Sequence, residues 1–124
     1  MQFDSPSLLR LLLEADDQAL DTLPFGVVGM DLNGTVRRYN RFESDLSGMR
    51  PETVIGRHFF TEVAPCTNNF MVAGRYDGEE TLDEALDYVF TYRMAPTKVR
   101  LRLLKDTALG CQYLCVRRPS AAAD

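Results

Sequence analysis

The stretch FGVVGMDLNGTVRRYNRFESDLSG, residues 25–48, contains the patterns of a hairpin followed by a helix. Apolar residues from Phe25 to Met30 predict a strand, and Asn33-Gly34 is the strongest hairpin signal in the chain. Thr35 to Tyr39 then returns as the partner strand. Two neighbouring antiparallel strands are therefore predicted.

The second half of this stretch predicts a short helix. Asn40 is a favourable N-cap residue, Glu43 follows at the spacing of a capping box, and Gly48 suits the C-terminus. In a capping box Glu43 would be exposed, ionised and without a chemical role. That interpretation stays open beside the one developed below.

The residues on either side predict further elements. On the N-terminal side, Ser5-Pro6 predicts the start of a helix that runs through Leu13 and carries a stripe of leucines. Residues 16–21 predict a second helical turn. We therefore expect residues 1–22 to form a helical cap. On the C-terminal side we predict a helical turn at 51–56, followed by Phe59 and Phe60 as anchors in the core. A helix is predicted over about 70–82, with an interruption near Gly78. Strands are predicted at 86–94, 98–104 and 112–117, and the tail at 119–124 is predicted to be frayed.

This order of elements predicts an α+β domain. A five-stranded antiparallel sheet carries short helices on one face and the N-terminal helices on the other, and residues 23–118 form the core unit. The chain has 124 residues, enough for one core without disulfides or a structural metal. We therefore expect a single compact unit, and a monomer.

Charge and composition exclude several classes of function. Eighteen acidic residues outnumber 14 basic ones, which argues against nucleic acid or an anionic membrane as partner. The pairs Arg37-Arg38 and Arg117-Arg118 are interpreted as solvated strand ends. Because Arg10 interrupts the apolar run at residues 8–13, we expect neither signal peptide nor membrane span, and a cytoplasmic protein.

Of the three cysteines, Cys66 has the most informative surroundings. It lies in the turn Val-Ala-Pro-Cys-Thr, residues 63–67. Cys111 and Cys115, four apart on one strand, are about 13 Å apart and cannot form a disulfide; we expect both to be inert. His58 is the only histidine, so we expect no metal site, and a thiol hydrolase using Cys66 and His58 is a weaker hypothesis.

Cys66 combined with Tyr39 and Glu43 indicates a bound small molecule. A thiol can hold the molecule covalently, while a phenol and a protonated carboxylic acid donate hydrogen bonds to a charged atom at its far end. A carboxylic acid stays protonated at pH 7 only if its surroundings raise its pKa from about 4.3 to above about 7, which burial beside a negative centre can do. Taken singly, Tyr39 is also consistent with an ordinary strand aromatic, and Cys66 with an inert buried thiol.

These motifs resemble the photoactive yellow proteins, or xanthopsins, a branch of the PAS superfamily. The resemblance covers roughly residues 20–118. It rests on Asn33-Gly34, Tyr39-Asn40, Glu43, Gly48, the segments 54–56 and 59–60, residues 62–67, Tyr88, Phe90, Tyr92, Met94 and residues 96–99.

The resemblance implies a PAS-like fold and a chromophore, p-coumaric acid, held as a thioester on Cys66. It also implies that Tyr39 and Glu43 bind the phenolate oxygen, that Ser47 supports Tyr39, and that the N–H of Cys66 holds the thioester carbonyl. The pocket lining that it implies comprises Met49, Phe59, Thr67, Tyr88, Phe90 and Met94.

The implied function is that of a blue-light photoreceptor, not an enzyme. Light isomerises the vinyl bond from trans to cis, Glu43 gives its proton to the phenolate, and the buried charge partly unfolds the protein, releases the cap and signals to an unknown downstream protein. The alternative is a PAS-like ligand-binding or protein-interaction module without chromophore.

The chain departs from the family pattern at three places. Met49 stands where the family has an arginine that shields the pocket, and Ser47 replaces a threonine while keeping the hydroxyl. The connection from Cys66 to Tyr88 is shorter than in the family by about three residues. These differences bear on solvent access and on the rate of recovery.

Overall fold

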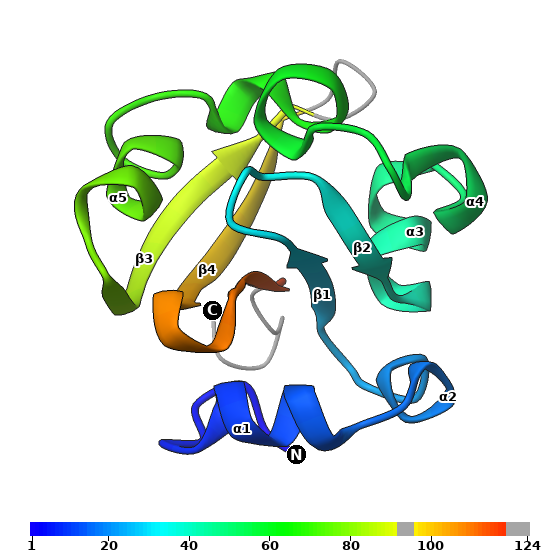
Figure 1. The fold of residues 1–124 in the computed structure, drawn as a ribbon. Helices are drawn as coiled ribbons and strands as arrows, with labels where there is room; N and C mark the ends of the chain where they lie inside the picture. The colour runs from blue at the N-terminus through cyan, green and yellow to red at the C-terminus, as the bar shows by residue number, and fades with distance from the viewer. Residues whose placement is uncertain (92–95, 119–124) are drawn as a thin grey trace.

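The structure, a computed structural model, describes residues 1–91 and 96–118 (Figure 1). It contains a five-stranded antiparallel sheet in the order β2-β1-β5-β4-β3. The strands are β1 (Gly26–Met30), β2 (Val36–Tyr39), β3 (Thr81–Phe90), β4 (Thr97–Asp106) and β5 (Cys111–Arg117). The predicted α+β class and five-stranded sheet are confirmed.

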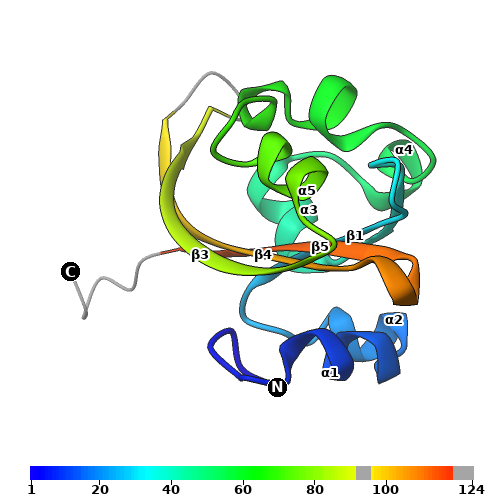
Figure 2. The same cartoon turned by 60° about the vertical axis from the view of Figure 1, so that its left-hand side comes forward.

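Helices cover both faces of the sheet (Figure 2). One face carries α3 (Arg41–Ser47), α4 (Pro51–Val54), α5 (Ala73–Gly78), the π-helix η1 (Phe59–Val63) and the 3-10 helix η2 (Pro65–Thr67). The other face carries α1 (Leu8–Glu14) and α2 (Asp17–Leu20), and the 3-10 helix η4 (Thr107–Leu109) connects β4 to β5. Among the described residues, no helix has the length and apolar character needed to span a membrane.

The predicted hairpin joins β1 to β2. Gly34 has a φ of 86°, a value that glycine adopts at little cost, and its N–H donates to the carbonyl of Asp31. The carboxylate of Asp31 accepts from the N–H groups of Asn33 and Thr35. The turn is therefore fixed by glycine and by an aspartate that sequence analysis did not single out.

The segment after α4 covers the outer edge of β2. Gly56 donates its N–H to the carbonyl of Val36 at 2.8 Å, and Phe59 donates to that of Gly34 at 2.8 Å. This pairing satisfies an edge that would otherwise be open. It also directs Phe59 into the core and sets the start of the π-helix that leads to Cys66.

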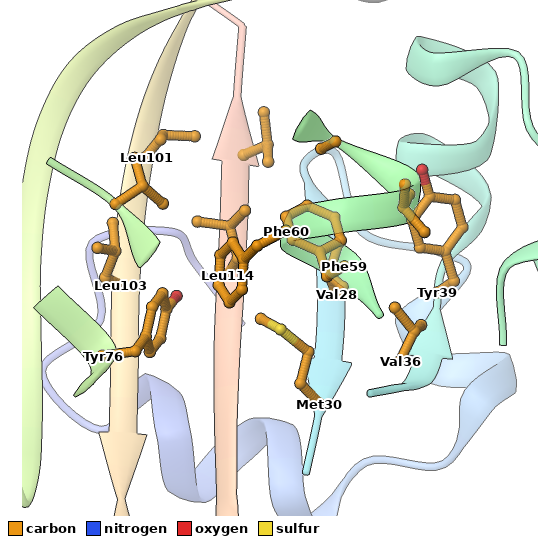
Figure 3. Packing of buried hydrophobic residues seen from close by; sticks show 14 of the residues in the cluster. Val28, Met30, Val36, Tyr39, Phe59, Phe60, Tyr76, Leu101, Leu103 and Leu114 are labelled. Atoms are coloured by element: carbon orange, nitrogen blue, oxygen red, sulfur yellow. The ribbon is translucent and has the colours of Figure 1, made fainter. Parts of the chain in front are cut away.

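The main buried cluster lies between the sheet and the helices from α3 to α5. Figure 3 shows Tyr39 at one end of the cluster, Tyr76 at the other, and Phe59 and Phe60 between them. The two phenylalanine rings meet edge to face, with centroids 5.3 Å apart. The predicted anchoring role of Phe59 and Phe60 is confirmed.

Two arginines of the sheet hold the N-terminal segment by its main chain. Arg38 donates to the carbonyls of Leu12 and Ala15 at the end of α1, and Arg102 donates to the carbonyl of Phe3. Carbonyls in the last turn of a helix have no partner within it, so a guanidinium fits there. The prediction that Arg38 is a solvated strand end is wrong, because its side chain is only 18% exposed.

Some predicted boundaries also differ. α1 begins at Leu8, not at Pro6, because Arg102 binds the carbonyls of Phe3 and Ser5 and keeps that segment outside the helix. Leu13 belongs to the predicted leucine stripe but is 40% exposed. Of Tyr92, Met94 and the tail at 119–124, nothing is described, since they lie outside the described residues.

The strands of the C-terminal half are longer than predicted. β3 starts at Thr81, within the predicted helix region, because its first residues pair with the end of β4 as far as Asp106. α5 ends at Gly78, where the interruption was predicted. Strand pairing therefore decides the conformation of residues that have no clear periodicity of their own.

Candidate functional site

Cys66 lies in the first turn of η2, directly after Pro65, and is half-buried. Its side chain borders a cavity of about 410 Å³. The described residues that line this cavity are Ser47, Met49, Val63, Ala64, Pro65, Cys66 and Thr91. The structure thus brings together three of the predicted site residues, Cys66, Ser47 and Met49, around one cavity.

The main chain of Cys66 is held by two side chains. Tyr88 donates its hydroxyl to the carbonyl oxygen of Cys66 at 2.6 Å, and Asn69 donates its amide to the same oxygen at 3.2 Å. Tyr88 was predicted as a pocket residue, whereas Asn69 was not singled out. The peptide that adjoins the thiol is therefore fixed from outside its own turn.

Tyr39 is connected to the cavity wall through Ser47. The two hydroxyl oxygens are 2.8 Å apart, and Ser47 also accepts the N–H of Met49 at 3.1 Å. Tyr39 is 5% exposed. This contact agrees with the role that the resemblance implies for Ser47, and a phenol hydroxyl can take part in a second hydrogen bond.

Glu43 is wholly buried, one turn before Ser47 on α3. The predicted N-cap is present, because Asn40 accepts the N–H of Glu43 at 3.2 Å. The N–H of Asn40, which a capping box would pair with Glu43, donates instead to the carbonyl of Val27. The interpretation of Glu43 as an exposed capping residue is therefore wrong.

The carboxyl group of Glu43 occupies space left by a glycine. A Cβ atom placed on Gly26 of β1 would lie 2.2 Å from Oε1 of Glu43 and 3.2 Å from its Cβ. Any side chain at position 26 would therefore displace the carboxyl group. Sequence analysis did not single out Gly26.

The remaining predicted pocket residues lie in the same layer. Phe59 and Phe90 are buried in the cluster that contains Tyr39, and Met49 packs against it. Thr67 is buried, and its hydroxyl donates to the carbonyl of Ala64 at 2.7 Å. Of the predicted pocket residues only Met49 is among the described residues that line the cavity, and Met94 lies outside the described residues. The described lining does not include Tyr39, Glu43, Phe59, Thr67, Tyr88 or Phe90.

The other two cysteines differ from Cys66 in surroundings. Cys115 is fully buried and Cys111 half-buried, and burial raises the pKa of both thiols. A thiol whose pKa is raised is a poor nucleophile at neutral pH. Cys66 borders the cavity that Ser47 also lines, and this position favours Cys66 as the reactive thiol.

His58 has a structural role away from this cavity. Its Nδ1 accepts the N–H of Thr61 at 3.2 Å and so caps η1, and its ring borders a separate small cavity together with Gln112. His58 does not line the described part of the Cys66 cavity, which gives no support to a cysteine-histidine dyad. Within residues 1–91 and 96–118, no three histidine, cysteine or acidic side chains gather in a metal-binding arrangement.

A larger cavity, of about 680 Å³, lies between α1 and the ends of β3 and β4. Its described lining includes Leu9, Leu13, Leu82 and Leu109 and none of the predicted site residues. Size alone would select this cavity, but of the two only the smaller one has in its described lining a thiol and Ser47, the hydrogen-bond partner of Tyr39.

Known proteins resemble the chain over most of its length. Residues 20–117 match the PAS fold family. The photoactive yellow protein of Halochromatium salexigens is 35% identical over 121 residues, which are 95% of this chain and 97% of that protein. This chain belongs to the photoactive yellow protein family.

Two further comparisons agree with membership of this family. The photoactive yellow protein of Rhodobacter capsulatus is 36% identical over 110 residues, covering 86% of this chain and 89% of that protein. The crystal structure of the photoactive yellow protein domain from the sensor histidine kinase Ppr of Rhodospirillum centenum has a TM-score of 0.77 and 46% identity. It covers 84% of this chain and 100% of that domain. The PAS fold and the family resemblance are therefore confirmed.

Proposed function

We propose that this chain is a blue-light photoreceptor that carries p-coumaric acid as a thioester on Cys66. One arrangement carries the proposal: a half-buried thiol borders a cavity whose wall includes Ser47, Ser47 binds Tyr39, and Glu43 is buried one turn earlier on the same helix. The names of the relatives agree with a photoreceptor.

The residues present fit such a chromophore. A cavity of about 410 Å³ lies within the range of small-molecule sites, about 300 to 1,000 Å³. A phenolate oxygen in an apolar pocket needs donors that replace water. A protonated Glu43 would be one such donor, and the hydroxyl of Tyr39 would be the other after its proton, now donated to Ser47, turns to the phenolate and Ser47 donates to Tyr39 in its place. Tyr39 and Glu43 are both buried, so they would offer one phenol and one carboxylic acid away from solvent.

Cys66 would form the covalent link. Its sulfur would attack the carbonyl carbon of an activated p-coumaroyl thioester, the carbon–sulfur bond to the donor would break, and the proton lost by Cys66 would leave with the donor's thiol. The N–H of Cys66 comes from the first turn of η2, where amide groups have no partner within the helix, and would hold the carbonyl oxygen. Met49, Phe59, Thr67, Tyr88, Phe90 and Met94 would line the pocket.

The bound chromophore supplies a conjugated phenolate that absorbs blue light and a double bond that isomerises from trans to cis. Glu43 would hold a transferable proton on its carboxyl group and would donate it to the phenolate oxygen. The carboxylate that remains is wholly buried. An unneutralised buried charge costs several kcal/mol, which is a large part of the stability of a domain, about 5–15 kcal/mol.

Asn40 connects Glu43 to the N-terminal cap. Its amide accepts the N–H groups of Glu43 and Val27 and donates to the carbonyls of Leu20 and Phe25. A displacement of the start of α3 therefore acts directly on the last residue of α2 and on the segment that follows it. We propose that the cap, residues 1–22, is released by this route and exposes a surface for a downstream signalling protein.

The second candidate is a PAS-like binding or interaction module without chromophore. Two observations favour it: Met49 borders the cavity where the family has an arginine, and Tyr39 and Glu43 do not line the described cavity. Mass spectrometry of protein made in cells that synthesise p-coumaroyl thioesters separates the two. A p-coumaroyl mass on the Cys66 peptide supports the photoreceptor, and an unmodified Cys66 supports the module.

A further inference from the structure

We propose that Asn69 is a positioning residue for Cys66, acting together with Tyr88 as a clamp on the cysteine's main chain. This inference rests on the proposed function, since the position of the thiol matters only if Cys66 carries the chromophore. It assigns roles to Asn69 and to the hydroxyl of Tyr88 that neither the motifs nor the comparisons supply.

Three hydrogen bonds define the clamp. Asn69 Nδ2 donates to the hydroxyl oxygen of Tyr88 at 2.6 Å and to the carbonyl oxygen of Cys66 at 3.2 Å, and the Tyr88 hydroxyl donates to that same carbonyl at 2.6 Å. The carbonyl of Cys66 thus receives two donors, one from β3 and one from the following loop. The triangle fixes the rotation of the peptide that follows the cysteine and, through it, the direction of the thiol.

The other end of the Asn69 side chain orders the next turn. Its Oδ1 accepts the N–H groups of Met71 and Val72 at 2.9 and 3.2 Å. Phe70 is 92% exposed, so burial of this ring does not hold the turn in place. One amide group therefore connects the attachment cysteine to a surface turn, with its donor side on Cys66 and its acceptor side on the turn.

The donor and acceptor ends of the Asn69 amide can be tested with separate variants. Asn69→Asp keeps the oxygen that accepts from Met71 and Val72 but removes the amide hydrogens that bind Cys66 and Tyr88. It therefore breaks the clamp and keeps the hydrogen bonds that order the turn. Tyr88→Phe removes the other donor to Cys66. Asn68→Ala is the matched control, because Asn68 is the exposed neighbour of the same residue type.

The first readout uses the protein before it is loaded with chromophore. Pulsed alkylation with iodoacetamide, followed by peptide mapping, gives the labelling rate of Cys66, with Cys111 as internal reference. Each variant removes one hydrogen bond to the Cys66 carbonyl, so we expect Asn69→Asp and Tyr88→Phe each to raise the Cys66 labelling rate about fivefold. The Cys66 rate in Asn68→Ala and the Cys111 rate in every variant should stay unchanged. Amide exchange at Met71 and Val72 should stay slow in Asn69→Asp and become fast in Asn69→Ala.

The second readout uses protein reconstituted with an activated p-coumaric ester. Opening the clamp should shift the absorption maximum and slow the dark recovery, because a less ordered cysteine turn must be reordered. Equal Cys66 labelling rates in wild type, Asn69→Asp and Asn68→Ala would overturn the clamp, whatever the colour of the protein. If wild type takes up no chromophore but the labelling rates differ as expected, the clamp stands and the photoreceptor proposal fails.

Discussion

The carboxyl group of Glu43 lies against the α-carbon of Gly26, in the space where any other residue would have its Cβ atom. β1 and α3 therefore approach each other closely at the residue proposed to hold the transferable proton. The absence of a side chain at position 26 allows Glu43 to be buried in this position.

Replacing Gly26 by alanine should displace Glu43. The added Cβ would lie 2.2 Å from Oε1, so we expect a loss of about 1–3 kcal/mol in the free energy of unfolding, as for other overpacked sites. The loss should shrink in a Glu43→Ala background, where Oε1 is removed and only the 3.2 Å approach to the Cβ of residue 43 remains. Gly78→Ala is the control, since nothing lies within 4 Å of its added Cβ. Equal losses in both backgrounds, measured by urea unfolding, would contradict the contact.

Glu43→Gln should shift the visible band of the reconstituted protein to longer wavelength. An amide donates a weaker hydrogen bond to a phenolate than a carboxylic acid does, so it stabilises the ground-state charge less. Glu52→Gln, at an exposed position of α4, should leave the band in place. Identical spectra for wild type and Glu43→Gln would show that Glu43 does not contact the chromophore.

Arg38→Met should loosen the N-terminal cap. The substitution keeps an apolar stem but leaves the carbonyls of Leu12 and Ala15 without their donor, which we expect to cost about 2 kcal/mol. Arg37→Met is the matched control, because Arg37 is 61% exposed and makes a surface ion pair with Asp31 worth at most about 1 kcal/mol. Limited proteolysis within residues 1–22 should be faster in Arg38→Met only; equal rates in the two variants would contradict the role of Arg38.

Asp31 should make the β1–β2 hairpin sensitive to acid. Burial raises the pKa of Asp31, but hydrogen bonds from Thr35 and Asn33 and the neighbouring Arg37 outweigh this and leave it below its ordinary value. A lowered pKa in the folded state stabilises the protein above the unfolded value of about 3.9, and this stabilisation is lost as the pH falls through the folded value.

The measurement for Asp31 is the free energy of unfolding between pH 7 and pH 3. Asp31→Ala should be less stable than wild type by about 1–2 kcal/mol at pH 7, and the difference should narrow below about pH 4. Asp45→Ala, at an exposed position of α3, should show no such narrowing. A difference between wild type and Asp31→Ala that does not change with pH would contradict this assignment.

Local sequence signals were sufficient to predict the β1–β2 hairpin and α3. Asn33-Gly34 predicts the hairpin because glycine adopts the φ of 86° found there, and Asn40 with Gly48 predicts both ends of α3. The start of β3 could not be predicted, because Thr81 takes its conformation from pairing with Asp106, far along the chain.

The candidate site was likewise only partly predictable from the sequence. Cys66, Tyr39 and Glu43 stand in motifs and could be named from the sequence. Gly26 and Asn69 could not, because their roles depend on a close approach of β1 to α3 and on hydrogen bonds across a loop. The hydrogen bonds of the Arg38 guanidinium could not be predicted either, because they are made to main-chain carbonyls of a different element.

The most direct test of the photoreceptor proposal is the visible spectrum of purified protein after incubation with an activated p-coumaric ester. Wild type should gain a visible band that bleaches under blue light and recovers in the dark, and Cys66→Ala should stay colourless. A wild-type protein without a visible band, or a Cys66→Ala protein with the same reversible band, would contradict the account.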